Sequence, residues 1–377
     1  MAVIVGRQSL NMVRLYGINP MVRCFLVLEN GTVLEGVSFG HESAVLDEMI
    51  FTTCMSGYQE YLTDPAYKGK ILVSAFPLIG DYGVNDRYSQ SDRVHASGLV
   101  VREYSEDPTD MYGGRTLHEY LKKNKVPGIS GVDTRDIIRM IRREGAMGAA
   151  VVYDEKEIDA AKKKLKEKRE DDDLVKLVSP KKKKIIDNGK GIKLGVIDCG
   201  MRRSMINDLS EDYDLVVFPY DAKAKEITDS GVSGLVISHG PGNPAHPDII
   251  SNVVRTVKEL SSKMPMAGVS FGAQVIALAF GCGTVKLKFG HNGGSQPVKY
   301  GDRVHITSQN HMYSVDPDSL KGTGLKMDQV NVNDGTLEGF SHTSLPVFGI
   351  QYDPASPKYE KDSFFYEKLK KVTGGGK

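Results

Sequence analysis

PMAGVSFGAQVIALAFG, residues 265–281, is the stretch that decides the fold of the C-terminal half of the chain. Small and apolar residues lead into Ser270, and a helix-forming run follows until Gly281. A strand, a sharp turn and a helix in this order are typical of a nucleophile elbow. Gly268 and Gly272 have no Cβ, so the chain can turn tightly and the strand and helix can approach closely. Since free N–H groups at a helix start can hold an oxyanion, Ser270 occupies the position of a nucleophile.

The segments around the elbow alternate between apolar β-rich runs and helix-forming runs. Strands separated by helices predict a parallel sheet with flanking helices, an α/β fold. Beyond residue 283 the pattern changes to short strands with turns, followed by a polar helix. The predicted strands are 192–199, 215–218, 234–238, 284–289, 304–307, 325–332, 337–340 and 347–351, and the predicted helices are 202–209, 249–260 and 361–371.

The N-terminal half has a different pattern and predicts a smaller α+β domain. Two strands, 22–28 and 32–39, are joined at Asn30-Gly31, which is a strong hairpin signal. A helix over 132–144 is opened by Asp133 as a cap. This half contains no visible catalytic constellation. Its other predicted elements are strands at 49–53, 71–77 and 95–102 and a helix at 117–124, and residues 145–152 close this half.

A charged segment, 156–184, separates the two halves. It could bind an anionic partner or form a solvated helix and linker. Interleaved acidic residues and the lack of aromatic side chains for base stacking favour the linker. The predicted division is a loose extension over 1–20, a first domain over 21–153, a linker over 154–190, a second domain over 191–372 and a flexible tail over 373–377.

The composition is that of an ordinary soluble protein. The chain has 377 residues, a net charge of +1, 40% apolar residues and 26% charged residues, so nothing global indicates nucleic acid or an anionic membrane surface. Four scattered cysteines without a C-x-x-C pair argue against a zinc site or a disulfide framework and fit a reducing cytoplasm. No apolar run approaches the roughly 20 residues of a membrane span, and the first twenty residues lack the apolar core of a signal peptide.

Several ordered motifs in both halves resemble one family. The N-terminal motifs are LENGTVLEGVSFG (28–40), FTTCMSGYQEYLTDPAYKGKI (51–71) and DTRDIIRMIRREGAMGA (133–149). The C-terminal motifs are HGPGNP (239–244), GVSFGAQ (268–274), KLKFGHNGGSQPV (286–298), TSQNHMYSVD (307–316), DGTLEG (334–339) and QYDPASP (351–357). The C-terminal half is similar to a class I glutamine amidotransferase domain with a flavodoxin-like sheet. Together the halves resemble the small chain of carbamoyl-phosphate synthase.

This resemblance implies a subunit that hydrolyses glutamine and passes ammonia to a large synthetase chain. That partner combines ammonia with bicarbonate and ATP into carbamoyl phosphate for arginine and pyrimidine synthesis. ATP and magnesium belong to the large chain, and no cofactor or metal is implied for this one. The family's glutaminase uses a Cys nucleophile in the elbow, a His base and a Glu that orients the His, the last two in an HPE sequence.

The sequence departs from the family pattern at the catalytic positions. Ser270 replaces the Cys, Ala273 stands where the family usually has a His, and the HPE sequence reads Asp353-Pro354-Ala355. A serine hydroxyl is protonated at neutral pH and needs a base, and a carboxylate at Asp353 cannot replace an imidazole. The substitutions predict little or no glutamine hydrolysis.

The resemblance also implies a set of substrate-binding positions, two of them altered. Cys54 stands where the family has a glutamine-contacting Ser, and Met312 replaces a Gly. The other implied positions are Gly240, Gly242, Phe271, Gln274, Asn310 and Tyr313. An alternative for each is a packing or turn residue.

Three alternatives remain open at this point. His239 could reach Ser270 and act as its base, although a strand-end His is more often structural. Gly268-Val269-Ser270-Phe271-Gly272 matches G-x-S-x-G and could belong to a serine hydrolase. A non-catalytic interaction or glutamine-sensing protein would keep the fold and the partner surface without hydrolysing glutamine.

Overall fold

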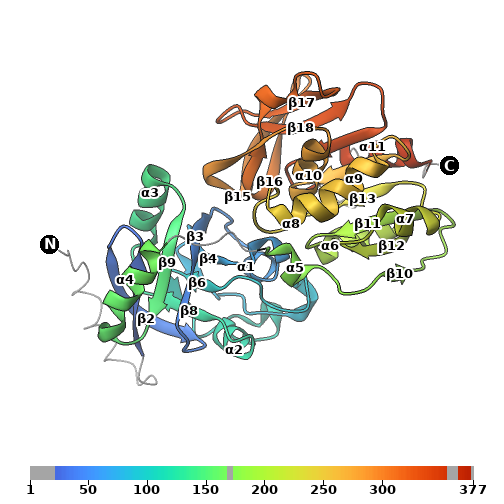
Figure 1. Cartoon of the computed structure of the whole chain (residues 1–377). Helices are drawn as coiled ribbons and strands as arrows, with labels where there is room; N and C mark the ends of the chain where they lie inside the picture. The colour runs from blue at the N-terminus through green and yellow to red at the C-terminus, as the bar shows by residue number, and fades with distance from the viewer. Residues whose placement is uncertain (1–21, 168–172, 355–363, 375–377) are drawn as a thin grey trace. The chain divides into compact units, whose positions relative to one another are not determined.

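The computed structural model describes residues 22–167, 173–354 and 364–374, and the chain divides into two compact units, Met1–Glu170 and Asp171–Lys377 (Figure 1). The predicted extension over 1–20 lies outside the described residues, as do Ala355 and the first residues of the helix predicted at 361–371. The exact limits predicted for the domains and the linker stay predictions. No helix in these described ranges is both long and apolar enough to cross a membrane.

The N-terminal unit is built on a closed barrel with the strand order β1-β2-β8-β6-β4-β3-β9. Its strands are β1 (Arg23–Leu28), β2 (Val33–Gly40), β3 (Val45–Thr52), β4 (Lys70–Ser74), β6 (Gly98–Val100), β8 (Pro127–Ser130) and β9 (Met147–Val152), with β5 (Leu78–Ile79) and β7 (Glu103–Tyr104) paired separately. The hairpin predicted at Asn30-Gly31 is present, because β1 and β2 are antiparallel with Val27 opposite Val33 and Gly31 has a φ of 91°. β9 pairs with both β1 and β3 and so closes the barrel.

The helices of this unit are α1 (Tyr58–Leu62), α2 (Leu117–Lys123), α3 (Thr134–Glu144) and α4 (Ile158–Lys166), with 3₁₀ turns at Pro65–Tyr67, Asp86–Tyr88, Asp110–Tyr112 and Glu155–Glu157. Asp133 caps α3 as predicted, because its side chain accepts a hydrogen bond from the N–H of Asp136 at 3.0 Å. The charged segment differs from the solvated helix that its composition suggests. Ala161 and Leu165 of α4 are buried in an apolar cluster with Phe25 and Val27, so this helix covers the barrel with one face.

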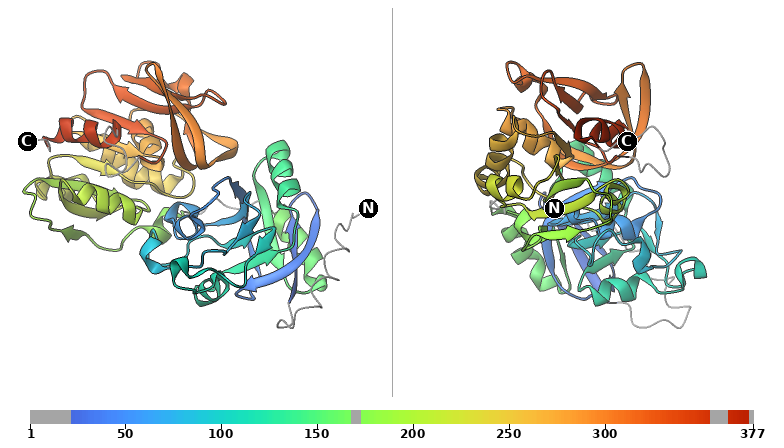
Figure 2. Two further views of the ribbon diagram at one scale, coloured as in Figure 1. Left: turned by 180° about the vertical axis from the view of Figure 1, so that it is seen from behind. Right: turned by 90° about the vertical axis from the view of Figure 1, so that its right-hand side faces the viewer.

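The C-terminal unit contains a ten-stranded sheet with the order β10-β12-β11-β13-β14-β19-β18-β17-β15-β16. Figure 2 shows the ribbon of this unit from two further sides. Its strands are β10 (Lys184–Ile186), β11 (Lys193–Asp198), β12 (Asp214–Pro219), β13 (Leu235–Ile237), β14 (Met266–Val269), β15 (Thr284–Tyr300), β16 (Arg303–Val315), β17 (Leu325–Asn331), β18 (Leu337–His342) and β19 (Val347–Ile350). The five strands from β12 to β19 are parallel, which confirms the predicted α/β fold. The strands beyond β19 pair antiparallel.

Helices bury apolar residues on both faces of this sheet. Val253, Val257 and Val275, from the helices around 247–260 and from α10, belong to one cluster, and Met205 and Phe365, from α6 and α11, belong to the other. The helices are α5 (Val175–Val178), α6 (Arg203–Ser210), α7 (Ala224–Asp229), α8 (Pro247–Ile249), a π-helical turn (Ile250–Val254), α9 (Arg255–Leu260), α10 (Phe271–Ala279), a 3₁₀ turn (Pro317–Leu320) and α11 (Phe364–Thr373).

Candidate active site

The elbow predicted from the sequence forms between β14 and α10. Ser270 has φ 53° and ψ −114°, a left-handed conformation that is strained for a residue with a side chain. A Cβ on Gly272 would lie 2.0 Å from the carbonyl oxygen of Ile237, and one on Gly268 would lie 2.6 Å from the N atom of Ala273. Both glycines are therefore needed where the helix approaches the sheet.

Among the residues that the structure describes, no base forms a hydrogen bond with the hydroxyl of Ser270. The side chain is 2% exposed, and its Oγ donates to the carbonyl oxygen of Asn310 at 3.5 Å, the long limit for a hydrogen bond. The N–H of Ser270 donates to the carbonyl oxygen of Ile350 at 2.7 Å and is thus committed to the sheet. None of the hydrogen bonds of Ser270 to described residues involves a histidine. Within the described parts of the chain, this serine therefore has no hydrogen-bond partner that could take its proton.

Asp353 is fixed between two basic side chains at the carboxyl ends of the parallel strands. Its Oδ1 lies 2.9 Å from Nε2 of His239, which follows β13, and its Oδ2 lies 2.7 Å from Nη1 of Arg202, which follows β11. The N–H of Asp353 donates to the carbonyl oxygen of Ser308 at 2.8 Å. Such strand ends meet at one edge of a parallel sheet, and this brings the three side chains together.

The neighbours of Asp353 hold it as a carboxylate. Burial by itself would raise the pKa of Asp353, but the charge of Arg202 and the hydrogen bond with His239 outweigh that effect and lower it to about 2. At neutral pH this carboxyl group is ionised, and each of its two oxygens lies beside a basic side chain. It is therefore a very weak base, as the sequence analysis predicts for this position.

His239 does not act as a partner of Ser270 in this structure. Its Nε2 faces Asp353, and its Nδ1 is buried without a hydrogen-bond partner among the described residues. The hydrogen bond that would make it the base of Ser270 is absent. His239 instead forms a hydrogen bond with the carboxylate of Asp353, and the charge of that carboxylate is balanced by Arg202.

Gln274 and Tyr313, two implied substrate-binding residues, lie in an internal hydrogen-bond network. Nε2 of Gln274 donates to the carbonyl oxygen of Tyr313 at 2.5 Å and to Oε1 of Gln351 at 3.2 Å. Gln351 also accepts from the N–H of Val315 at 3.1 Å. These bonds hold α10 against β16, a packing role that uses both N–H groups of the Gln274 amide.

The remaining predicted positions are distributed over both units. Gly240 is close to α10, since a Cβ there would lie 3.0 Å from a ring carbon of Phe271, and Gly242 has a φ of 85°. The sulfur of Met312 accepts from Nδ2 of Asn292 at 3.7 Å. Cys54 belongs to the N-terminal unit and is half-buried just after β3. Their roles in substrate binding stay predictions.

The sequence did not predict Arg202 as the ion-pair partner of Asp353. The position of Arg202 could have indicated this pairing. Cys199-Gly200-Met201-Arg202 follows β11 directly, at the sheet edge where His239 and Asp353 also lie. A cation at that edge is a natural partner for an unexpected Asp.

Comparisons with known proteins agree on both halves of the chain. Residues 26–151 match the family model of the carbamoyl-phosphate synthase small chain, CPSase domain, and residues 184–371 match that of glutamine amidotransferase class-I. The carbamoyl phosphate synthase small chain of Methanopyrus kandleri is 43% identical over 88% of this chain and 94% of its own. That of Methanosarcina mazei is 41% identical over 94% of this chain and 100% of its own. Among solved structures, a glutamine amidotransferase of Thermotoga maritima is 13% identical, with a TM-score of 0.34 over 48% of this chain and 84% of its own.

Proposed function

The chain belongs to the family of carbamoyl-phosphate synthase small chains, and we propose that within a synthase it serves as a small subunit that has lost its own glutamine hydrolysis. The observation that carries the proposal is the fixed position of Asp353. The family places its His base there, but here an ionised carboxylate is paired with Arg202 and His239.

The chemistry of amide hydrolysis explains why this arrangement is inactive. Attack on a carboxamide requires a deprotonated nucleophile, and a serine hydroxyl needs an adjacent base to lose its proton. In the described ranges, the hydroxyl of Ser270 has a carbonyl oxygen as its hydrogen-bond partner, and a carbonyl cannot accept the proton as a base. Loss of nucleophile and base together leaves only binding and any oxyanion stabilisation.

The function that remains is structural. The N-terminal unit keeps its closed barrel and the family's motifs, which supports continued docking on a large synthetase chain. That partner would carry ATP and magnesium and make carbamoyl phosphate from bicarbonate and free ammonia. This chain would complete the assembly without supplying ammonia.

The test is carbamoyl-phosphate synthesis by the complex purified with its large chain. We expect synthesis with ammonium and none above background with glutamine, under otherwise equal conditions. A matched measurement on the pure chain should find no ammonia released from glutamine. Synthesis with glutamine that survives removal of trace ammonia would overturn the proposal, and His239 would then be the first residue to replace.

The alternatives are weaker on the same geometry. A serine hydrolase needs a base hydrogen-bonded to its nucleophile, and Ser270 has none among the described residues. A glutamine sensor would need free binding groups, whereas both N–H groups of the Gln274 amide already donate within the protein. Titration calorimetry with millimolar glutamine should show no binding heat.

A further inference from the structure

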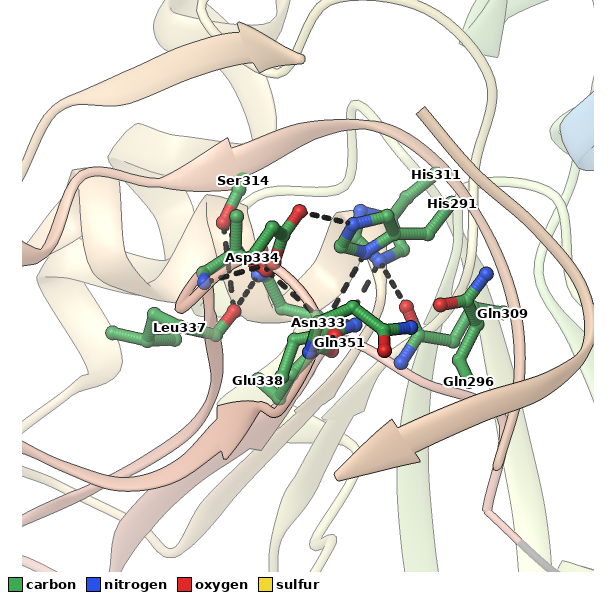
Figure 3. A network of polar contacts seen from close by, with 12 residues as sticks. His291, Gln296, Gln309, His311, Ser314, Asn333, Asp334, Leu337, Glu338 and Gln351 are labelled. Carbon is green, nitrogen blue, oxygen red and sulfur yellow. Dashed lines mark hydrogen bonds and ion pairs between the residues drawn. The ribbon is translucent and has the colours of Figure 1, made fainter. Parts of the chain in front are cut away.

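Three buried side chains from three strands meet in the C-terminal unit, and we call them the His–His–Glu cluster. They are His291 on β15, His311 on β16 and Glu338 on β18, and one nitrogen or oxygen atom from each lies within 4.8 Å of the others (Figure 3). The two histidines are 6% exposed and Glu338 is not exposed at all. Because these ionisable groups are buried, each of their polar atoms needs a hydrogen-bond, ionic or metal partner.

One nitrogen of each histidine is committed to an acceptor outside the cluster. Nδ1 of His311 lies 2.8 Å from the carbonyl oxygen of Tyr313, which can only accept, so this nitrogen carries a proton. Nε2 of His291 lies 2.8 Å from Oδ2 of Asp334 and donates to that carboxylate. Metal-binding histidines are held in this way, with the second ring N–H donating to a carbonyl or carboxylate.

The other nitrogen of each histidine also faces an acceptor. Nδ1 of His291 lies 3.2 Å from Oε1 of Glu338. Nε2 of His311 lies 3.0 Å from Oε1 of Gln309 and 4.0 Å from Oε2 of Glu338. That second oxygen of Glu338 has no hydrogen-bond partner among the described residues. Lone pairs therefore converge on one place inside the cluster.

A chain of hydrogen bonds fixes the direction of the Gln309 amide. The hydroxyl of Thr307 donates to the carbonyl oxygen of Gln296 at 2.9 Å, so its Oγ1 is free to accept. Nε2 of Gln309 donates to that Oγ1 at 3.1 Å. The amide oxygen of Gln309 consequently points toward His311.

With Glu338 and Asp334 as carboxylates, two neutral histidines cannot satisfy this arrangement, because each histidine has one proton for two acceptors. Two extra protons would fill both inner positions, but they would create two buried imidazolium ions with ring centroids 4.9 Å apart. One divalent cation supplies the same charge of +2 at a single point, and the lone pairs inside the cluster can all coordinate it. That charge also balances the carboxylates of Glu338 and Asp334.

We propose that the His–His–Glu cluster binds one divalent metal ion, with zinc as the expected occupant. Two imidazoles and a carboxylate form a donor set that suits zinc, with bonds of about 2.0–2.2 Å. The inner nitrogens of His291 and His311 and the carboxylate of Glu338 would be the ligands, and the amide oxygen of Gln309 or a water would complete a tetrahedron. Ligand atoms in such a site are about 3.3 Å apart, so the side chains move inward by about 1 Å on binding.

The position of the cluster gives the metal a structural role. The ion would tie β15, β16 and β18 together at the residue next to Asn310, whose carbonyl accepts from Ser270. The scattered cysteines argue against a cysteine zinc site, and this site uses none. The proposed metal site does not depend on whether the chain hydrolyses glutamine.

The test uses the full chain without a polyhistidine tag. We expect about one zinc per chain by elemental analysis, and a higher Tm when zinc is added back to chelator-treated protein. Cobalt should replace zinc and give the visible absorption of a tetrahedral site. Glu338→Gln and His311→Gln should weaken metal binding at least 100-fold. His305→Gln, on the same strand but outside the cluster, is the matched control and should bind as the unsubstituted chain does.

Two results would overturn the proposal. One is a folded, chelator-treated chain that takes up neither zinc nor cobalt and shows no change in Tm, because protons would then fill the cluster. The other is equal metal retention by the cluster variants, because the ion would then lie elsewhere. If Glu338→Gln does not fold, Asp334→Asn removes only the outer partner of His291 and should weaken binding about 10- to 100-fold.

Discussion

The proposed loss of glutamine hydrolysis involves the replacement of several residues, so we expect that restoring one of them does not reverse it. Ser270→Cys supplies a better nucleophile but leaves Asp353 as a paired carboxylate. We expect this variant to release ammonia from glutamine less than 10-fold above background. S270C/D353H/A355E brings back the Cys, His and Glu of the family and should exceed S270C by at least about 100-fold, because a general base contributes roughly 10²–10⁴.

The control for this rescue is S270C/D353Q/A355E, which has the nucleophile and no imidazole. It should stay at the level of S270C in the same ammonia assay. Arg202 favours the neutral form of a His placed at 353, which is the form that accepts a proton. If S270C alone matches the triple variant, the base lies elsewhere in the chain.

The pair of Asp353 with Arg202 and His239 should also be visible in stability. Asp353→Asn leaves the Arg202 charge without its carboxylate, and we expect the C-terminal unit to lose about 2 kcal/mol of unfolding free energy at pH 7. This is below the roughly 3–5 kcal/mol of a fully buried pair, because Arg202 keeps 18% of its side-chain exposure. Urea unfolding measures the difference, and Asp229→Asn, in an exposed pair with Lys225, should change little.

The same pair predicts the pH dependence of that difference. The pKa of Asp353 is about 2 in the folded chain and about 3.9 when unfolded, so the unfolded chain takes up a proton first as pH falls. The stabilisation is therefore complete above about pH 4 and is lost as pH falls toward 2. The gap between the unsubstituted chain and Asp353→Asn should shrink over this window, and a constant gap would contradict the ion pair.

At the scale of elements, the elbow depends on glycine at the contact between α10 and β13. Gly272→Ala would place a Cβ 2.0 Å from the carbonyl oxygen of Ile237, a backbone atom that cannot move alone. We expect a loss of more than about 3 kcal/mol or failure of the C-terminal unit to fold. Gly294→Ala, where a Cβ meets nothing within 4 Å, should cost only a few tenths. Equal unfolding midpoints in urea for the two variants would contradict this account.

The elements predicted best were those whose signal lies in one continuous stretch. The elbow strand and helix, the hairpin at Asn30-Gly31 and the Asp133 cap were all predicted and found. The short elements α7 and β10 were missed, because three to six residues carry little periodicity. β15 and β16 were predicted as short strands but run for 17 and 13 residues, since the polar and glycine-rich segment 290–296 interrupts the alternation at register shifts.

Side-chain partners at the site were harder to predict than its backbone. The position of Ser270 followed from local sequence, whereas the pairing of His239 with Asp353 joins residues 114 positions apart. The sequence allows His239 as a base for Ser270, because no sequence signal shows which way the imidazole ring points. Arg202 was missed for the same reason.

At the scale of the whole molecule, two compact units with separate cores suggest that the barrel folds alone. We expect a fragment of residues 22–167 to unfold cooperatively in far-UV circular dichroism, because the barrel strands and the covering helix α4 all lie within it. The matched control is residues 22–145, which lacks β9 and so leaves β1 and β3 unpaired on one side. That shorter fragment should not fold, and cooperative unfolding by both would show that closure is dispensable.

Closure of the barrel is also what the sequence could not show. The predicted strands of the N-terminal half were largely correct, but nothing in them indicated that Phe25 lies opposite Val152. Pairings over such separations depend on the whole chain, and local patterns leave the order of strands open. The sequence therefore predicted the α+β class of this half but not its closed barrel.

The two sheets differ in how they would behave in concentrated solution. Every strand of the barrel is paired on both sides, while the described strands of the larger sheet end at β10 and β16. β10 has three residues and follows a run of lysines, two features that discourage another chain from adding to an edge. β16 is long and carries Val304 and Ile306, exposed by 54% and 68%. Self-association of the isolated subunit should therefore begin with contacts at the edge of β16, and these contacts should limit its solubility.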